Sequence, residues 1–219
     1  MSWTRAGAVI QDLLRRANAS PPAPNDLVRR WDRETRLAVL TPWFSAPPGT
    51  RVFGPEAYGD LLEYGPEVIA GPVPDLVRLA RGVLDGAVRV GERHLGVVAW
   101  SGIGRPALSP AERDILWLAF QAPVFEDFRN WCGELFAWEC EAHDGMHVAA
   151  DSAHFSASPS DAELYVSAVG EPGRPLSYLP TGLTGEVVTE TCPCGIAGPR
   201  LTGLGAKAEP FVSALALGA

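Results

Sequence analysis

Four soft metal ligands, divided between two short segments, are the feature that most constrains how this chain can fold. Cys140 and His147 lie in the first segment, and Cys192 and Cys194 lie in the second, further along the chain. Sulfur and nitrogen donors arranged in two such pairs can close a four-coordinate zinc site. A site of this kind ties two distant parts of a chain together without needing a large core. The sequence therefore predicts that these two segments meet.

The local pattern around each pair supports this prediction. Apolar and polar residues alternate before Asp144-Gly145 and resume after it, and an Asp-Gly dipeptide between two such arms is a strong hairpin signal. The hairpin would place Cys140 and His147 on opposite arms, near its tip. In the second segment one proline separates the two thiols, and Gly195 lets the chain turn away. This tight spacing suits a closed structural site, whereas a catalytic zinc keeps an open position for water.

Two further residues compete for places in this ligand set. His143 is an alternative nitrogen ligand, and Cys132 is an alternative sulfur ligand. His147 is favoured because a residue after the turn faces back along the hairpin, whereas His143 lies within the approach to the turn. The other interpretation is that the cysteines are buried thiols and the histidine is a surface residue. The spacing leaves that interpretation open, since it is not a standard paired Cys-x-x-Cys knuckle.

Composition excludes several classes of protein. Apolar residues make up 47% of the chain and charged residues 20%, which is typical of a globular protein rather than a disordered one. The formal net charge of −8 argues against non-specific nucleic-acid binding, which needs a basic surface. No apolar run approaches the ~20 residues of a membrane span, and the N-terminal segment is too charged for a signal peptide. We expect a cytoplasmic protein that binds neither nucleic acid nor membrane, with cysteines that do not form disulfides.

The order of elements predicts a mixed α/β (α+β) fold. Residues 1–86 read as a mainly helical N-terminal region, with helices over 6–18, from Asn25 to about Leu37, and from Pro74 to Leu84. Residues 87–219 read as a mixed α/β region that ends in a zinc-stapled β subdomain. We expect the two regions to form one compact unit.

Within the second region the turn signals predict individual elements. Residues 87–100 read as a hairpin that turns at Gly91-Glu92, and Ser109-Pro110 opens a helix as N-cap and first helical residue. Residues 162–169 and 185–191 read as strands, and 209–217 as a short apolar tail with helical character.

Three stretches resemble one protein family. Residues 139–148 (Glu-Cys-Glu-Ala-His-Asp-Gly-Met-His-Val) are similar to the Glu-Cys…Gly-Met-His segment of the phenylacetate–CoA ligase and coenzyme F390 synthetase branch of the adenylate-forming superfamily. Residues 175–182 resemble its Pro…Tyr-Arg-Thr-Gly-Asp stretch, and residues 192–200 resemble its Cys-Pro-Cys-Gly-Arg…Pro-Arg segment. The match covers roughly residues 125–204 and is weak upstream of 105. In such relatives four equivalent ligands hold zinc, so the resemblance implies this role for Cys140, His147, Cys192 and Cys194.

Several positions depart from the family pattern. The Ser/Thr/Gly-rich loop that holds ATP phosphates ends in lysine, but its nearest counterpart here, residues 101–106, carries Arg105 instead. This segment reads more simply as a strand end that leads into the helix at Pro110. The ribose-binding acid expected after Thr-Gly is Leu183, which cannot accept those hydrogen bonds. Lys207, the only lysine, does not match the family's C-terminal lysine, and the sequence ends about where that mobile domain would begin.

These observations predict a shortened, degenerate relative of the family that keeps the structural zinc and has no catalytic residue. We expect an accessory or ligand-binding protein without stand-alone ligase activity, which would not use ATP or CoA without a partner. Its expected partners are another protein or a second copy of the chain, and its expected ligand is a small carboxylic acid. The alternative is an ATP-dependent carboxylic acid–CoA ligase that forms an acyl-adenylate.

Overall fold

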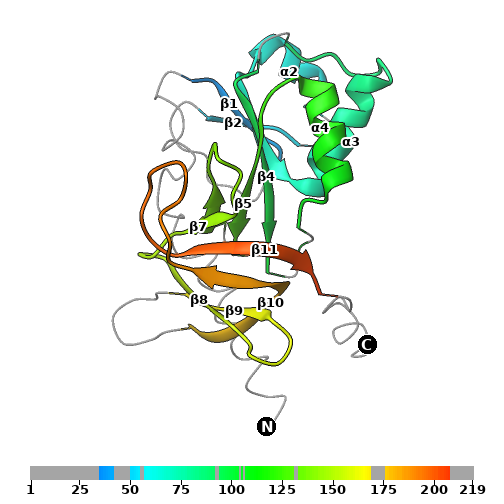
Figure 1. The fold of residues 1–219 in the computed structure, drawn as a ribbon. Helices are drawn as coiled ribbons and strands as arrows, with labels where there is room; N and C mark the ends of the chain where they lie inside the picture. The colour runs from blue at the N-terminus through cyan, green and yellow to red at the C-terminus, as the bar shows by residue number, and fades with distance from the viewer. Residues whose placement is uncertain are drawn as a thin grey trace, which may run out of the picture.

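A single large sheet dominates the structure, which is a computed structural model. It describes residues 35–41, 50–54, 57–91, 94–103, 105, 107–130, 133–168 and 176–207. Within these ranges eleven strands form one mixed sheet in the order β2-β1-β3-β4-β5-β6-β7-β11-β10-β9-β8 (Figure 1). The helix predicted over 6–18, the tail predicted over 209–217 and most of the helix predicted after Asn25 lie outside the described residues. The last residue of that second helix, Leu37, is in a strand.

The first half of the sheet is parallel. Its members pair side by side through β2-β1-β3-β4-β5, and every one of these pairings is parallel. The strands are β1 (Leu37–Val39), β2 (Thr50–Val52), β3 (Val68–Pro72), β4 (Gly96–Gly102) and β5 (Val124–Arg129). Residues 35–86 thus contain three strands that the sequence did not predict, beside their helices. The β3–β4 pairing also crosses residue 87, the boundary between the two predicted regions.

Helices connect the parallel strands, as parallel neighbours require. The helix α2 (Gly59–Tyr64) precedes β3, α3 (Val73–Leu84) joins β3 to β4, and α4 (Pro110–Phe120) joins β4 to β5. The prediction for α3 is confirmed. So is the cap of α4, where the Ser109 hydroxyl accepts from the Glu112 backbone and the Glu112 side chain accepts from the Ser109 backbone. This reciprocal capping box satisfies two amide groups that a helix start leaves unpaired.

The predicted hairpin over residues 87–100 is wrong. Residues 96–102 form β4, but β4 pairs in parallel with β3 and β5, and residues 87–90 belong to no strand. Val88 instead lies over the end of α3, where its amide donates to the Gly82 carbonyl at 2.9 Å. The error has a physical cause, because a strand buried on both faces reads as a continuous apolar run and the run alone does not reveal its partner.

The second half of the sheet is antiparallel. Its strands continue from β5 in the order β6-β7-β11-β10-β9-β8, all antiparallel to their neighbours. They are β6 (Leu135–Glu139), β7 (Met146–Val148), β8 (Ala153–Ala157), β9 (Glu163–Ala168), β10 (Leu176–Val188) and β11 (Arg200–Ala206). The hairpin predicted around Asp144-Gly145 is confirmed as β6–β7, with Trp138 opposite His147. The predicted strands over 162–169 and 185–191 correspond to β9 and to the end of β10, whereas β8 and β11 were not predicted.

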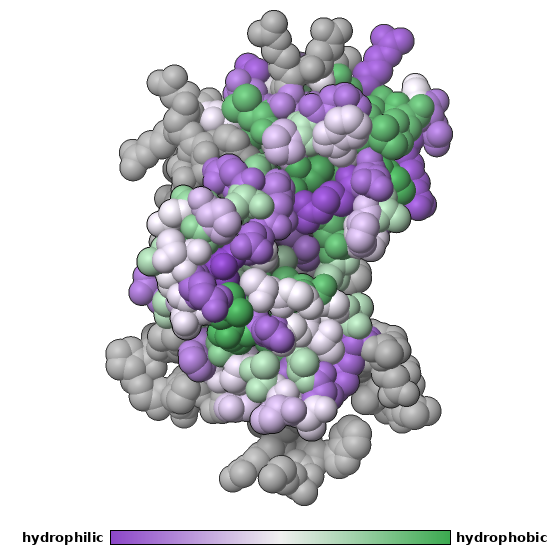
Figure 2. Space-filling model, viewed as in Figure 1, coloured by the Kyte–Doolittle hydropathy of each residue, from purple (hydrophilic) through white to green (hydrophobic). Residues whose placement is uncertain are grey.

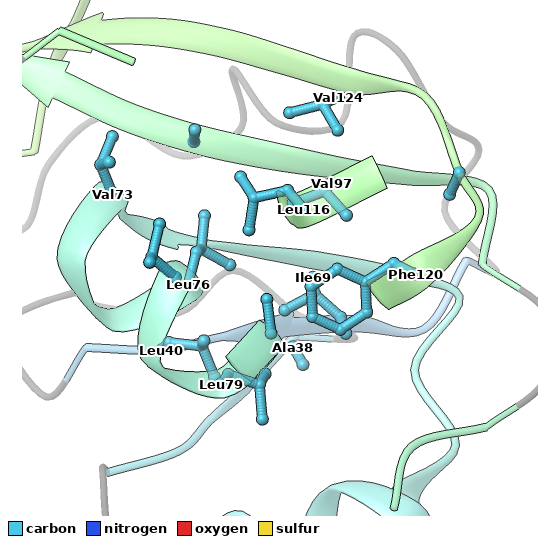
Figure 3. Close-up of a cluster of buried hydrophobic side chains, with 14 of the residues drawn as sticks. Ala38, Leu40, Ile69, Val73, Leu76, Leu79, Val97, Leu116, Phe120 and Val124 are labelled. Carbon is cyan, nitrogen blue, oxygen red and sulfur yellow. The ribbon is translucent and has the colours of Figure 1, made fainter. Parts of the chain in front are cut away.

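Apolar side chains form a core in each half. In the parallel half, residues of α3 and α4 point onto the sheet, where Leu76, Leu116 and Phe120 contact the face that carries Ile69 and Val97 (Figure 3). A second cluster, which includes Phe128, Phe136 and Leu201, fills the antiparallel half. The pairing of β5 with β6 joins the two halves within one sheet.

Hydrophilic and apolar residues are interspersed on the face that Figure 2 shows, and green patches appear both over the half that bears the helices and lower down, over the antiparallel half. Three of the exposed apolar side chains belong to those helices: Leu84 at the end of α3, and Trp117 and Leu118 on α4. Among the described residues, no helix is both long enough and apolar enough to cross a membrane.

Candidate metal centre

The structure brings the four predicted ligands together. Cys140 directly follows β6, His147 lies in β7, and Cys192 and Cys194 lie in the connection between β10 and β11. Because β11 pairs with β7, with Arg200 opposite His147, the connection that precedes β11 must return over the β6–β7 hairpin. The pairing of β7 with β11 therefore brings both pairs of ligands close together, as the sequence predicts.

The spacing of the ligand atoms suits a single metal ion. The three Sγ atoms and an imidazole nitrogen of His147 all lie within 4.8 Å of one another. The Sγ atoms of Cys140 and Cys192 are 3.6 Å apart, and the Sγ atom of Cys194 is 3.3 Å from Nε2 of His147. Tetrahedral zinc, with Zn–S near ~2.3 Å and Zn–N near ~2.0 Å, separates its ligand atoms by roughly 3.5–3.8 Å. The Cys3His group therefore fits a closed four-coordinate ion.

The electrostatics of the thiols show what a cation would contribute. Burial and the neighbouring thiols raise the pKa of Cys140 to about 12. Burial also acts to raise the pKa of Cys192, but hydrogen bonds from the Cys194 backbone and thiol and the positive charge of Arg200 outweigh it, so that pKa lies below its usual value. The pKa values of two thiols in contact are thus shifted in opposite directions. A bound zinc ion would hold both as thiolates.

His147 is well placed as the nitrogen ligand. The residue is only 3% exposed, and its ring stacks on Trp138 with centroids 4.8 Å apart. Burial, together with the positive charge of Arg200, lowers the pKa of the imidazole. The ring is therefore neutral at physiological pH, which is the form that binds metals.

His143, the competing nitrogen, lies outside the cluster. Its backbone has a φ of 50°, and its ring stacks on Phe125 with centroids 5.3 Å apart. Its Nδ1 atom is 2.9 Å from a carboxylate oxygen of Glu139, and its side chain is 42% exposed. The competing sulfur, Cys132, lies outside the described residues. The geometry thus agrees with the choice of His147, although ligation itself stays a prediction.

Glu139 positions the first cysteine. This buried carboxylate lies one residue before Cys140 and accepts from Arg113 of α4 at 3.0 Å and from the backbone amide of Glu126 in β5 at 2.9 Å. It also contacts His143, as described above. One side chain therefore links the helix, the parallel half of the sheet and the hairpin at the point where Cys140 leaves β6.

Arg200 positions the hairpin tip and is a residue whose role the sequence did not reveal. Its guanidinium is buried and donates to the Asp144 carboxylate at 2.8 Å and to the Asp144 backbone carbonyl. The charge pair holds the turn against the start of β11. The only signal in the sequence was the Pro-Arg dipeptide that closes the second ligand segment, and it did not identify Asp144 as the partner.

The segment nearest to a phosphate loop is held against the sheet. Ser101 and Gly102 end β4 and are buried, and the Arg105 amide donates to the Gly102 carbonyl at 2.9 Å. A Cβ atom on Gly102 would lie 2.0 Å from the Arg129 carbonyl oxygen, so this backbone is packed directly on β5. These contacts agree with the simpler interpretation of the segment as a strand end that leads toward α4.

Comparison with known proteins identifies the fold. No protein-family model matches the sequence, and no curated protein matches it. Among solved structures the chain is similar to 2-hydroxyisobutyryl-CoA ligase in the postadenylation state in complex with R3-HIB-AMP, with a TM-score of 0.60 and 16% identity over 79% of this chain and 44% of the ligase. The open conformation of that ligase in complex with 2-HIB-AMP and CoA gives a TM-score of 0.59 and 15% identity over 78% of this chain and 44% of the ligase.

The chain thus spans less than half the length of the ligases it matches. At this level of identity the similarity extends to the fold alone. The structure of this chain is therefore similar in fold to part of 2-hydroxyisobutyryl-CoA ligase.

Proposed function

We propose that this chain is a zinc-stapled, degenerate relative of the phenylacetate–CoA ligase branch, which acts as an accessory or ligand-binding protein without ligase activity of its own. The observation that carries the proposal is the environment of Leu183. Its side chain is 3% exposed and packs in the apolar core of the antiparallel half. In the family that the sequence resembles, an acid at this position binds the nucleotide ribose.

The backbone around Leu183 keeps an ordered turn although the acid is absent. The Thr181 hydroxyl donates to the Leu164 carbonyl at 2.8 Å and accepts from the Leu183 amide at 3.0 Å. Gly182 has a φ of 77°, which a residue with a side chain rarely adopts. This geometry supports the proposal that the turn of the family is kept, although a core residue stands where the family has its ribose-binding acid.

The single lysine is committed to structural ion pairs. The Nζ atom of Lys207 lies 2.7 Å from a carboxylate oxygen of Glu163 and 3.1 Å from one of Asp161. The Glu163 and Asp161 carboxylates raise the pKa of Lys207, so the amine stays charged. Tyr165 also donates to Glu163, at 2.8 Å. An ammonium group held in this way supports a role in linking the start of β9 to the end of β11, across β10, rather than contact with an acyl-adenylate.

The Cys3His group supports a structural ion in this proposal. Thiolates and imidazole select zinc among the common cellular divalent ions, whereas magnesium and calcium prefer oxygen ligands. Four ligands complete the tetrahedral shell, so no open position is left for a catalytic water. The metal would hold the β10–β11 connection on the β6–β7 hairpin. The accessory role would then depend on a protein partner or on a second copy of the chain.

Acid-dependent pyrophosphate release tests the proposal. Purified protein would be incubated with ATP, Mg²⁺ and a panel of aryl and alkyl carboxylic acids, with 2-hydroxyisobutyryl-CoA ligase and its own acid as the positive control. We expect release at the level of the protein-free blank for every acid, because the ribose anchor and a free lysine are both missing.

The same assay decides the alternative, an ATP-dependent carboxylic acid–CoA ligase. The shared fold favours this alternative, because the ligase structures that the chain resembles hold acyl-adenylates. Acid-dependent pyrophosphate release that disappears when the chain is heat-inactivated would replace the accessory role by ligase activity.

A further inference from the structure

Two of the clustered thiols are in contact although they belong to segments that are distant in the sequence. The Sγ atoms of Cys140 and Cys192 are 3.6 Å apart, and the two residues are separated by 52 positions. A disulfide has an S–S length of ~2.05 Å, so the two sulfur atoms need to approach by only about 1.5 Å. The structure therefore holds a pair of thiols that a small movement and an oxidant can join.

The turn that carries Cys192 has room for this movement. Its hydrogen bonds lie within the turn itself, where the Gly195 amide donates to the Cys192 carbonyl at 2.8 Å and the Cys192 amide donates to the Ile196 carbonyl at 3.4 Å. Among the described residues, no atom outside the adjacent residues lies within 4 Å of a Cβ built on Gly195 or Gly198. The turn is thus not packed tightly at these glycines and can shift as a unit toward Cys140.

The geometry favours this pair over the pairings that involve Cys194. A single proline separates Cys194 from Cys192, and its fixed φ limits the rotation that a bridge between such close residues needs. The Sγ atom of Cys194 lies within 4.8 Å of the other two sulfur atoms, but it contacts Nε2 of His147 at 3.3 Å. We therefore expect Cys194 to keep its thiol when the other two cysteines are joined.

Both thiols lie directly beneath the surface. Cys140 and Cys192 are 1% and 2% exposed, but Glu141 follows the first, Thr191 and Pro193 flank the second, and these three residues are all exposed. Hydrogen peroxide is hardly larger than water, so local opening of a surface turn admits it to thiols at this depth. Thiols prevail in a reducing compartment, so the bridge forms only when an oxidant is supplied.

We propose that the cluster is a redox-sensitive switch, in which peroxide joins Cys140 to Cys192 by a reversible disulfide that excludes a metal ion. One sulfur attacks the peroxide as a thiolate, so that an S–O bond forms, the O–O bond breaks and hydroxide leaves. The second thiol attacks this sulfenic sulfur, the S–S bond forms, the S–O bond breaks, and the proton of the second thiol leaves with the hydroxide as water. The proton of the first thiol converts the first hydroxide into water, so two thiols lose two electrons and one peroxide gains them.

The switch exchanges one link between the two segments for another. A metal ion bound by the Cys3His group and a Cys140–Cys192 bridge would both join the end of β6 to the β10–β11 connection. The two links exclude each other, because the bridge uses two of the four metal ligands. Oxidation therefore abolishes metal binding but keeps the segments joined. This competition rests on the proposed metal centre, whereas the bridge itself does not.

Thiol counting and peptide mapping test the bridge on the full chain. Purified protein is treated with a chelator, freed of it and exposed to hydrogen peroxide, and its thiols are counted after denaturation. The sequence has four cysteines, so we expect four thiols before oxidation and two after it. The map should show one pair of peptides joined through Cys140 and Cys192, and dithiothreitol should restore all four thiols.

Matched serine variants locate the bridge. Cys194→Ser should form the same bridge with the wild-type yield, whereas Cys192→Ser should leave Cys140 unbridged. If Cys192→Ser does not fold, the wild-type peptide map decides alone. The oxidised metal-free chain should also melt roughly 5–15 °C above the reduced metal-free chain, because a bridge between residues so far apart restricts the unfolded chain.

Zinc tests the competition. Zinc at 100 times its Kd leaves roughly 1% of the clusters free, so it should slow bridge formation about 100-fold. The oxidised chain should bind no zinc until dithiothreitol reduces it. Elemental analysis of the oxidised and the re-reduced chain measures this.

The outcomes separate the switch from the proposed metal centre. A map in which Cys140 is unbridged, or is joined to Cys132 or Cys194, overturns the switch, and so does a loss of thiols that dithiothreitol does not reverse. If zinc binds at one ion per chain but no bridge forms without it, the switch alone is overturned. If the bridge forms but the chain binds no zinc, the metal centre fails, and the competition fails with it.

Discussion

At the scale of single residues, burial sets the protonation of the first cysteine of the cluster. Cys140 and Cys192 are 1% and 2% exposed, and their sulfur atoms are in contact. Without metal, the raised pKa of Cys140 keeps its thiol protonated at neutral pH. A divalent cation would displace this proton, because the energy of coordinating thiolates exceeds the cost of deprotonation.

The two histidines of the hairpin provide a matched pair for testing the ligand set. His147→Ala removes the nitrogen ligand, and we expect it to lower the zinc content of purified protein far below one ion per chain. His143→Ala removes a ring that bonds to Glu139 outside the cluster, so zinc should remain near one ion per chain. Elemental analysis of the two variants beside wild type checks this. Retained zinc in His147→Ala, with loss in His143→Ala, would exchange the assignments.

At the scale of elements, the turn of the β6–β7 hairpin must fit closely against β11. Gly145 has a φ of 82°, and a Cβ atom there would lie 2.1 Å from the Leu201 carbonyl oxygen. The turn therefore needs glycine for two separate reasons: the left-handed backbone and the close approach of the neighbouring strand. Arg200, one residue before Leu201, binds the same turn through Asp144.

Gly145→Ala should destabilise the protein by roughly 2–4 kcal/mol, because the left-handed strain of about 1–2 kcal/mol is joined by the clash with β11. Gly86→Ala is its matched control. Gly86 has a φ of 72° but no atom within 4 Å of a built Cβ, so it should cost only the strain, about 1 kcal/mol. Denaturant unfolding of both variants measures the difference. Equal losses of unfolding free energy would show that β11 does not pack against the turn as described.

At the scale of the whole molecule, a metal ion bound by the Cys3His group would join two segments that share only a short strand pairing. The β7–β11 ladder has only two residue pairs, Arg200 with His147 and Leu201 with Met146. It is nonetheless the junction between the β6–β7 hairpin and the block formed by β8 to β11. A metal ion bound by residues on both sides of this junction would stabilise it, because so short a ladder contributes few hydrogen bonds.

Removal of zinc should therefore lower the thermal stability of the whole chain. Zinc at 100 times its Kd would stabilise the folded state by about 2.7 kcal/mol. For a chain of this size that corresponds to a fall in Tm of roughly 5–10 °C when a strong chelator is added. Calorimetry with and without chelator, followed by re-addition of zinc, measures it. A Tm that does not respond to the chelator would contradict a structural role for the metal.

The sequence predicted correctly those elements that are fixed by interactions within a few residues. The capping box at Ser109 and the Asp144-Gly145 turn each act within a few residues, so α4 and the β6–β7 hairpin could be read from the sequence. The partner of each strand could not be read from the sequence. Residues 96–100 were assigned to a hairpin but lie between two parallel neighbours, and β8 and β11 were missed because short strands beside Pro- and Gly-rich segments carry little periodicity.

The sequence by itself determined which residues can bind a metal, because the chemistry of thiol and imidazole side chains does not depend on the fold. It also determined that Leu183 stands where the family that the sequence resembles is expected to have an acid, and that Lys207 is the only lysine. Only the tertiary structure decided that the four ligands meet, that His143 turns toward Glu139, and that the carboxylates of Asp161 and Glu163 hold Lys207. The physical reason is that the ligand and lysine contacts join segments far apart in the sequence, and the register of the strands that carry those segments is set by burial and pairing across the whole sheet.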